Sequence, residues 1–66
     1  MCQARVYLAN EGSQALVAQD VIFLEEVPEG VRLGSFFEEP KLVRARVASV
    51  DFLKHTVILV PADAGT

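Results

Sequence analysis

The sequence is poor in the residues that form cross-links and large aromatic cores. It has one cysteine, one histidine and no tryptophan, and 8% of its residues are aromatic. A single cysteine excludes a disulfide within the chain. The longest apolar runs, of which residues 21–24 are one, are far shorter than the roughly 20 residues that cross a bilayer as a helix. The start also lacks the basic and then apolar layout of a signal peptide, because Gln3 and Arg5 interrupt it. These absences predict a soluble cytoplasmic protein that makes no membrane contact and keeps a reduced thiol.

The chain has 66 residues, and this length limits how it can be stabilised. A domain of this size buries only about 60% of the surface that its unfolded form exposes, so we expect low stability. Because a disulfide is excluded, a metal ion, a partner subunit or an unusually good core must contribute. Apolar residues make up 52% of the sequence, which favours a homodimer or another obligate contact. We expect one domain, residues 1–62, followed by a flexible tail, residues 63–66.

Positive charge is scarce. Six basic residues stand against nine acidic ones, and the net charge is −3. Nucleic-acid binding draws its affinity mainly from neutralised phosphates, so this balance argues against nucleic acid as a partner. A local basic strip is still compatible with it, because an aromatic and basic sheet face is how many single-stranded nucleic-acid binders work. The alternative is that the same arginines pair with carboxylates on a solvated face. The side chains that would form the strip are Arg5, Arg32, Arg44 and Arg46, around Tyr7.

Hydrophobicity alternates with a period of two along much of the chain, which indicates β-strands. In the opening stretch, residues 2–8, the even-numbered residues are apolar and share one face, whereas Gln3, Arg5 and Tyr7 share the other. Further strands are predicted at 14–18, 31–37, 41–51 and 56–60. Residues 21–24 are either a strand buried on both faces or a bend into another strand.

The longest predicted strand, 41–51, carries a break in its alternation. Val43, Ala45 and Val47 face one way, and the arginines between them face the other. Val50 is out of phase with Val47, which predicts a bulge or bend near residues 48 and 49. Turn residues at 10–13 and 28–30 predict tight connections between strands.

Five short strands with few residues between them predict an all-β fold, a small five-stranded antiparallel barrel of the SH3-like or Sm-like class. Curling the sheet in this way reduces its exposed edges. A competing interpretation is a helix over residues 14–26, where several apolar residues fit a period of 3.6. The β-branched Val21 and Ile22 favour the strand.

The sequence offers little for an enzymatic site. A nucleophile pair of Cys2 and His55 requires the two side chains to meet in space, whereas the simpler interpretation of His55 is an exposed residue in a tight turn. The glutamate pairs at 25–26 and 38–39 consist of neighbours that point to opposite faces of an extended chain. Neither pair is therefore a ready general acid and base, and we expect both to be solvated. We predict that the protein is not an enzyme.

Cys2 has two interpretations. A lone cysteine is by default a small buried hydrophobe. Its position beside the chain start supports a second interpretation, as a metal ligand. If Met1 is removed, the Cys2 amine and thiolate form a five-membered chelate; if Met1 stays, its amine, the Cys2 amide nitrogen and the thiolate can gather around one ion. Thiolate and nitrogen donors in a square plane suit Ni(II) or Cu(II). Because one cysteine cannot fill such a site, two copies across a two-fold axis would share the ion.

Three segments resemble the CooT family of small nickel-binding proteins associated with maturation of carbon monoxide dehydrogenase. They are the opening MCQARVYL, the middle DVIFLEEVPEGVRLGSFFEE and the closing VRARVASVDFLKHTVILV. The resemblance runs from Met1 to about Val60, and its most specific element is the Met-Cys start followed by an alternating strand. The segment around Phe36 and Pro40 departs from the family pattern. Relatives are also described as RNA-binding, on the strength of an Sm-like or SH3-like fold.

The resemblance implies a small β-barrel, a homodimer and one Ni(II) held between subunits through Cys2. The first hypothesis is therefore a non-enzymatic nickel metallochaperone, sensor or store, with carbon monoxide dehydrogenase as a client. The second is an Sm-like RNA-binding module that uses the basic strip. The third is an interaction protein whose exposed aliphatic face docks a partner and whose Cys2 is incidental.

Overall fold

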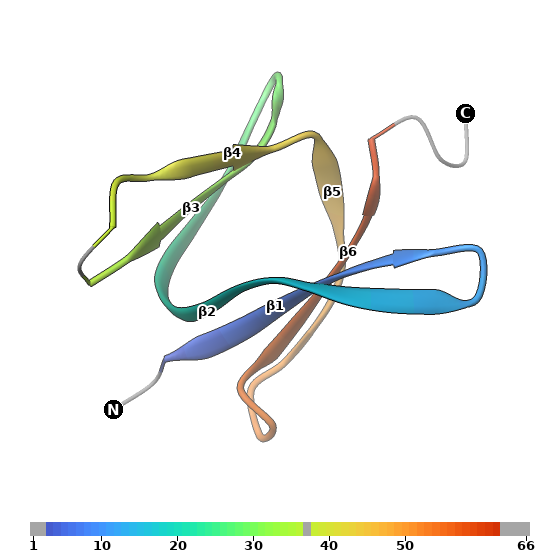
Figure 1. The fold of residues 1–66 in the computed structure, drawn as a ribbon, viewed down its shortest axis with the longest axis horizontal. Helices are drawn as coiled ribbons and strands as arrows, with labels where there is room; N and C mark the ends of the chain where they lie inside the picture. The colour runs from blue at the N-terminus through green and yellow to red at the C-terminus, as the bar shows by residue number, and fades with distance from the viewer. Residues whose placement is uncertain (1–2, 37, 63–66) are drawn as a thin grey trace.

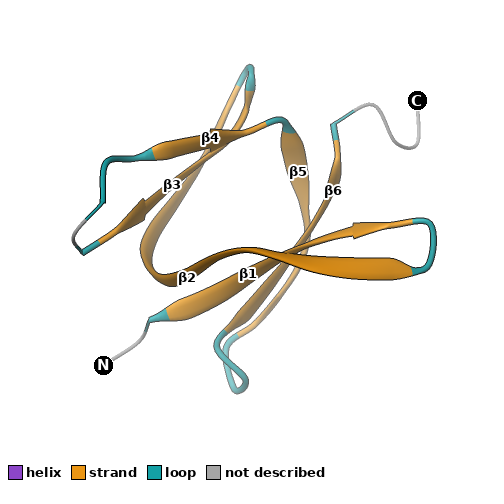
Figure 2. Ribbon diagram, viewed as in Figure 1, coloured by secondary structure: helices purple, strands orange, loops and turns teal. Residues whose placement is uncertain are grey.

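The computed structural model describes residues 3–36 and 38–62, and every regular element in these ranges is a β-strand (Figure 2). Within them, no helix is long and apolar enough to span a membrane. The predicted tail, residues 63–66, lies outside the described residues. The strands are β1 (Ala4–Asn10), β2 (Ser13–Val27), β3 (Gly30–Ser35), β4 (Lys41–Val43), β5 (Ala45–Asp51) and β6 (Thr56–Pro61).

The six strands form one curled sheet in the order β4-β3-β2-β1-β6-β5 (Figure 1). All neighbours are antiparallel except β1 and β6, which run parallel. The curl brings strands that are distant in this order together. The amide of Val47 on β5 donates to Oε2 of Glu26 on β2 at 3.3 Å, and β3 also contacts β5. The sheet thus forms a half-barrel.

The all-β, barrel-like prediction is confirmed, but the strand count and the purely antiparallel pairing were wrong. The predicted strand 41–51 is divided at Arg44 into β4 and β5, which lie at opposite edges of the sheet. The chain can cross between these edges in one residue because the curl has brought them close. After the β5–β6 hairpin, β6 pairs with the free side of β1 in the same direction, which makes the sheet mixed.

The helix over residues 14–26 is absent, because this segment belongs to the 15-residue strand β2. Residues 21–24 are not a separate strand buried on both faces, since Ile22 and Phe23 are exposed. Instead β2 bends within itself near Asp20, whose φ is +56°. The register between β2 and β1 skips residues 19 and 20 of β2. From Val21 onward, β2 pairs with β3. The strand β2 therefore belongs to two hairpins, β1–β2 and β2–β3, which lie at an angle to each other.

The predicted bulge in the longest strand is confirmed. The register of β5 against β6 shifts between Val47 and Ser49, which pair with consecutive residues of β6. The predicted turn at 10–13 is also present. Glu11 and Gly12 have φ of +52° and +87° there, and the Ser13 hydroxyl donates to the Asn10 carbonyl at 3.1 Å. Two central residues with positive φ match the right-handed twist of the flanking strands.

Among the described residues, the core is small and consists of aliphatic side chains from every strand except β4. The predicted alternation places them correctly: on β1 Val6 is fully buried, while Ala4 and Leu8 pack against the core. On the later strands Ala45 is buried and Val43 and Val47 pack against the core, as expected. The buried hydrophobic residues are Val6, Val21, Val31, Leu33, Ala45, Val57 and Leu59.

Replacing Gly30 with alanine is expected to destabilise the fold by more than about 2 kcal/mol. Gly30 is buried with φ of +151°, and an added Cβ would overlap the backbone carbonyl of Val43. That carbonyl cannot move freely, because Val43 is in register with Val31 of β3. Gly12→Ala is the matched control, since Gly12 also has positive φ but an added Cβ meets nothing within 4 Å. Urea unfolding measures both, and an equal loss in the two variants would contradict the steric argument.

Candidate functional site

The beginning of β1 lies between two hollows of different character. Gln3 lines a polar hollow of about 510 Å³, and Ala4 lines an apolar groove of about 310 Å³. Successive residues of an extended chain point to opposite faces, so this alternation follows from strand geometry. By the same alternation the sequence assigns Cys2 to the face of Ala4.

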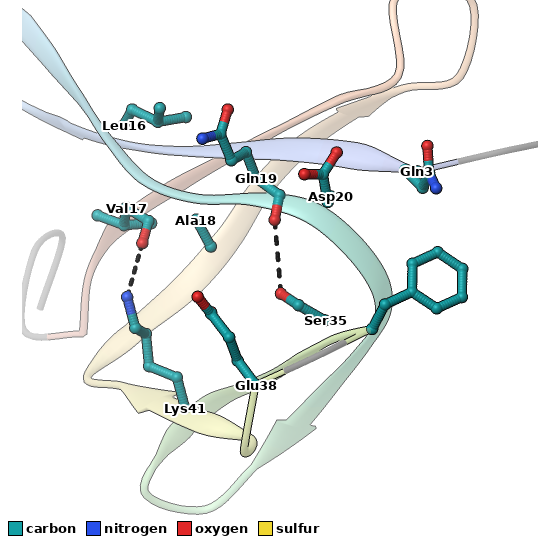
Figure 3. Close-up of a pocket in the computed structure, with 10 residues that line it drawn as sticks. Gln3, Leu16, Val17, Ala18, Gln19, Asp20, Ser35, Glu38 and Lys41 are labelled. Carbon is teal, nitrogen blue, oxygen red and sulfur yellow. Dashed lines mark hydrogen bonds between the residues drawn. The ribbon is translucent and has the colours of Figure 1, made fainter.

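The polar hollow lies where β2 bends away from β1 (Figure 3). Backbone groups in a bend lose ladder partners and must find others. Lys41 Nζ donates to the Val17 carbonyl at 2.8 Å, and the Ser35 hydroxyl donates to the Gln19 carbonyl at 3.4 Å. The lysine and serine therefore hold the β3–β4 segment against the bend, and their contacts are structural.

The apolar groove runs between the second half of β2 and the end of the β5–β6 hairpin. Buried Val21 and Val57 lie at its base, and the exposed side chains of Ile22, Phe23 and Val50 line it. Asp51 is the one carboxylate among its lining residues, and His55 is the one imidazole. The groove is therefore suited to an apolar occupant.

The predicted metal ligands, Met1 and Cys2, lie outside the described residues. Within residues 3–36 and 38–62, no group of three or more histidine, cysteine, aspartate or glutamate side chains is placed to hold a metal ion. A thiolate with amine or amidate nitrogen is a donor set that fits Ni(II). The chain's one cysteine and its terminal nitrogens supply such a set, so the donor chemistry is compatible with the ion that the family resemblance implies.

The four arginines of the predicted basic strip are spread over the sheet. Arg5 is in register with Thr56 of β6, and Arg46 is in register with Val60. Four residues along a strand separate these positions by about 13 Å. Arg44 lies between β4 and β5.

Arg32, on β3, has local partners. Its Nε is 3.0 Å from Glu25 Oε1, and its guanidinium lies 5.0 Å from the centroid of the Phe23 ring. The arrangement matches the solvated, ion-paired alternative for this residue, and the ion pair is exposed enough to contribute little to stability.

The other polar residues considered from the sequence lie where expected. The glutamates at 25–26 and 38–39 are exposed. His55 is exposed in the turn between β5 and β6, with φ of +53°. Its carbonyl accepts a hydrogen bond from the Arg5 amide at 2.9 Å, which ties this turn to the beginning of β1.

The sequence analysis assigned no position in a site to Phe52 or Leu53. The structure shows their side chains to be 84% and 90% exposed. Two adjacent large apolar residues in a turn were the available signal, because turn positions are normally occupied by polar residues, glycine or proline.

The curled six-stranded sheet and its aliphatic core define a small barrel-like all-β protein. A family model described as CO dehydrogenase accessory protein CooT matches residues 1–60. The chain belongs to the CooT family, and its class is therefore that of an accessory protein of CO dehydrogenase.

The fold also has a match among solved structures. The crystal structure of a CooT candidate from Carboxydothermus hydrogenoformans superposes with a TM-score of 0.85 at 24% sequence identity. The match covers 94% of this chain and 100% of the other. At this identity the similarity supports the fold alone. No curated protein matches the chain closely enough to count as a relative.

Proposed function

We propose that this chain is a non-enzymatic nickel-binding protein that acts in the cytoplasm as a homodimer. One Ni(II) is held between two subunits through Cys2 of each, with the nitrogen of Met1 or of Cys2 completing the donor set. The protein serves as a metallochaperone, sensor or store for maturation of carbon monoxide dehydrogenase. The observation that carries the proposal is the match to a CO dehydrogenase accessory family over residues 1–60, which includes the lone cysteine.

The donor chemistry supports this role. A soft thiolate is the ligand type that the rest of the sequence lacks, since Cys2 is the single cysteine. One thiolate and one neighbouring nitrogen fill half of a square plane, so a second chain is needed to complete it. A site shared across a two-fold axis also suits a cargo ion, because opening the dimer would release the metal.

The position of Cys2 along the chain supports it as well. Cys2 precedes Ala4 by two peptide units, a span of at most about 7.6 Å between Cα atoms. Ala4 lines the apolar groove, which is open to solvent and to a partner. The apolar face of β1 therefore reaches this groove at the beginning of the strand.

Titration of the purified, metal-free protein with Ni(II) tests the proposal. A thiolate-to-nickel charge-transfer band is expected to grow and to saturate at one ion per two chains. Saturation at one ion per chain would contradict the shared site, and absence of a band would contradict thiolate ligation.

The client role is tested separately. Nickel-free carbon monoxide dehydrogenase is expected to gain activity faster from the nickel-loaded protein than from the same concentration of free Ni(II) held by a small chelator. Equal rates of activation would contradict the delivery role, and sensing or storage would remain as the proposed roles.

A further inference from the structure

Large apolar side chains are gathered at one end of the half-barrel. Phe52 and Leu53 form the tip of the β5–β6 hairpin, and they are among the most exposed side chains of the described residues. Ile22, Phe23 and Val50, which are 39–46% exposed, line the adjoining groove. We call these five side chains the apolar end. A contiguous exposed apolar surface bordered by polar residues is often an interaction site.

The hairpin tip is held in place by its own polar groups. The Lys54 amide donates to Asp51 Oδ1 at 3.0 Å, and the Thr56 hydroxyl donates to the Lys54 carbonyl at 2.9 Å. The hydrogen bond from the Arg5 amide to the His55 carbonyl fixes the same turn to β1. Phe52 and Leu53 are therefore presented on an ordered turn, so little conformational entropy would be lost when they are covered.

The groove beside the tip is also preformed. The Phe23 ring lies over Gly34, where an added Cβ would overlap it. The guanidinium of Arg32 lies over the same ring, and its ion pair with Glu25 forms a polar border. An apolar hollow with a charged border resembles the core and rim of a protein interface.

We propose that the apolar end is the interface with a second copy of this chain, and that the Phe52–Leu53 tip of each copy packs into the groove of the other. The tip and the groove are adjacent on one molecule. A two-fold axis that passes between them therefore places the tip of each copy in the groove of the other, and the two contacts are equivalent, as an isologous interface requires. The existence of a dimer rests on the proposed function, whereas the surface is identified from the exposed apolar side chains of the structure.

The apolar area is compatible with a stable dimer, and the position of Ala4 favours a second copy over an unrelated partner. At their exposures the five side chains present on the order of 500 Å² of apolar surface. Each partner of a standard interface buries about 800 Å², so a polar border of modest width completes it. Ala4 lines the same groove, and a dimer formed there brings the two chain starts, each with its Cys2, to one interface. An ion shared by two Cys2 residues requires that arrangement.

Sedimentation velocity of the metal-free protein tests the interface without nickel. The wild type and Cys2→Ser are expected to be dimers. The double variant Phe52→Asp/Leu53→Asp is expected to be monomeric at concentrations at least 100-fold above the wild-type dissociation constant. Leu42→Asp, on edge strand β4, is the matched control, because its side chain is 50% exposed and lies outside the apolar end. It is expected to remain a dimer. Circular dichroism confirms that each variant is folded.

A double variant that remains dimeric, or a wild type that is monomeric without metal, would overturn the proposed interface. In either case a nickel band that saturates at one ion per two chains would leave the proposed function standing. Conversely, a dimer that depends on the tip but binds no nickel would support the interface and contradict the metal role.

The tip-in-groove arrangement has its own test. In a Cys2→Ser background, chains carrying Leu53→Cys are mixed with chains carrying Ile22→Cys under mild oxidation. A disulfide between the two kinds of chain is expected to form at least 10-fold faster than between Leu42→Cys and Ile22→Cys chains. Equal rates would overturn the packing of the tip into the groove.

Discussion

Replacing Cys2 with serine is expected to abolish the nickel charge-transfer band and to weaken Ni(II) binding by at least 100-fold. The hydroxyl keeps the size of the side chain, but it remains protonated and is a much harder donor than a thiolate. Because the shared site contains two copies of the residue, one substitution removes both thiolates. Absorbance titration and calorimetry measure the two effects.

Gln3→Ala is the matched control for that variant. It changes the next residue along the chain, which lines the polar hollow, and leaves the thiol intact. It is expected to bind nickel as the wild type does. The fold of Cys2→Ser is expected to be unchanged, since the substitution exchanges side chains of similar size and alters none of the described core residues. A band that persists in Cys2→Ser would contradict the ligand assignment.

Leu59→Ala is expected to destabilise the protein by about 2–5 kcal/mol. Leu59 is fully buried on β6, where it pairs with Leu8 on one side and Val47 on the other. A cavity at this point removes contacts from both neighbouring strands. Total stability at this length is on the order of 3–10 kcal/mol, so the variant loses a large part of it.

The control is Leu16→Ala on β2, where the side chain is 48% exposed and the expected loss is under about 1 kcal/mol. Urea unfolding at one fixed protein concentration compares the two, because dimer formation makes stability depend on concentration. Similar losses of stability in both variants would contradict the assignment of Leu59 to the core.

Alternation alone identified the core-facing residues of two strands. Val6, Ala45 and the neighbours that pack with them were assigned to the correct face, because a strand exposes every second residue to the same environment. The bulge between Val47 and Ser49 was also readable, since a bulge inserts one residue and shifts the phase of the pattern. Such features depend only on residues close together in the chain.

The pairing of the strands was harder to predict from the sequence. Nothing local indicates that β6 runs parallel to β1 or that the chain crosses between sheet edges at Arg44. The same limit applies to the basic strip, which alternation permits on each strand separately. Whether arginines on different strands meet depends on register, and the register separates Arg5 from Arg46.

The sequence by itself determined the all-β class, the faces of the strands and the candidate thiol at Cys2, which stays a prediction. It also indicated the family, because those residues recur in a recognisable order. The tertiary structure alone decided that β2 is one bent strand, that the sheet is mixed, and that Ala4 shares a groove with the second half of β2 and the β5–β6 hairpin. The physical reason is that local patterns specify which side of a strand is apolar, whereas long-range pairing specifies which apolar sides come together.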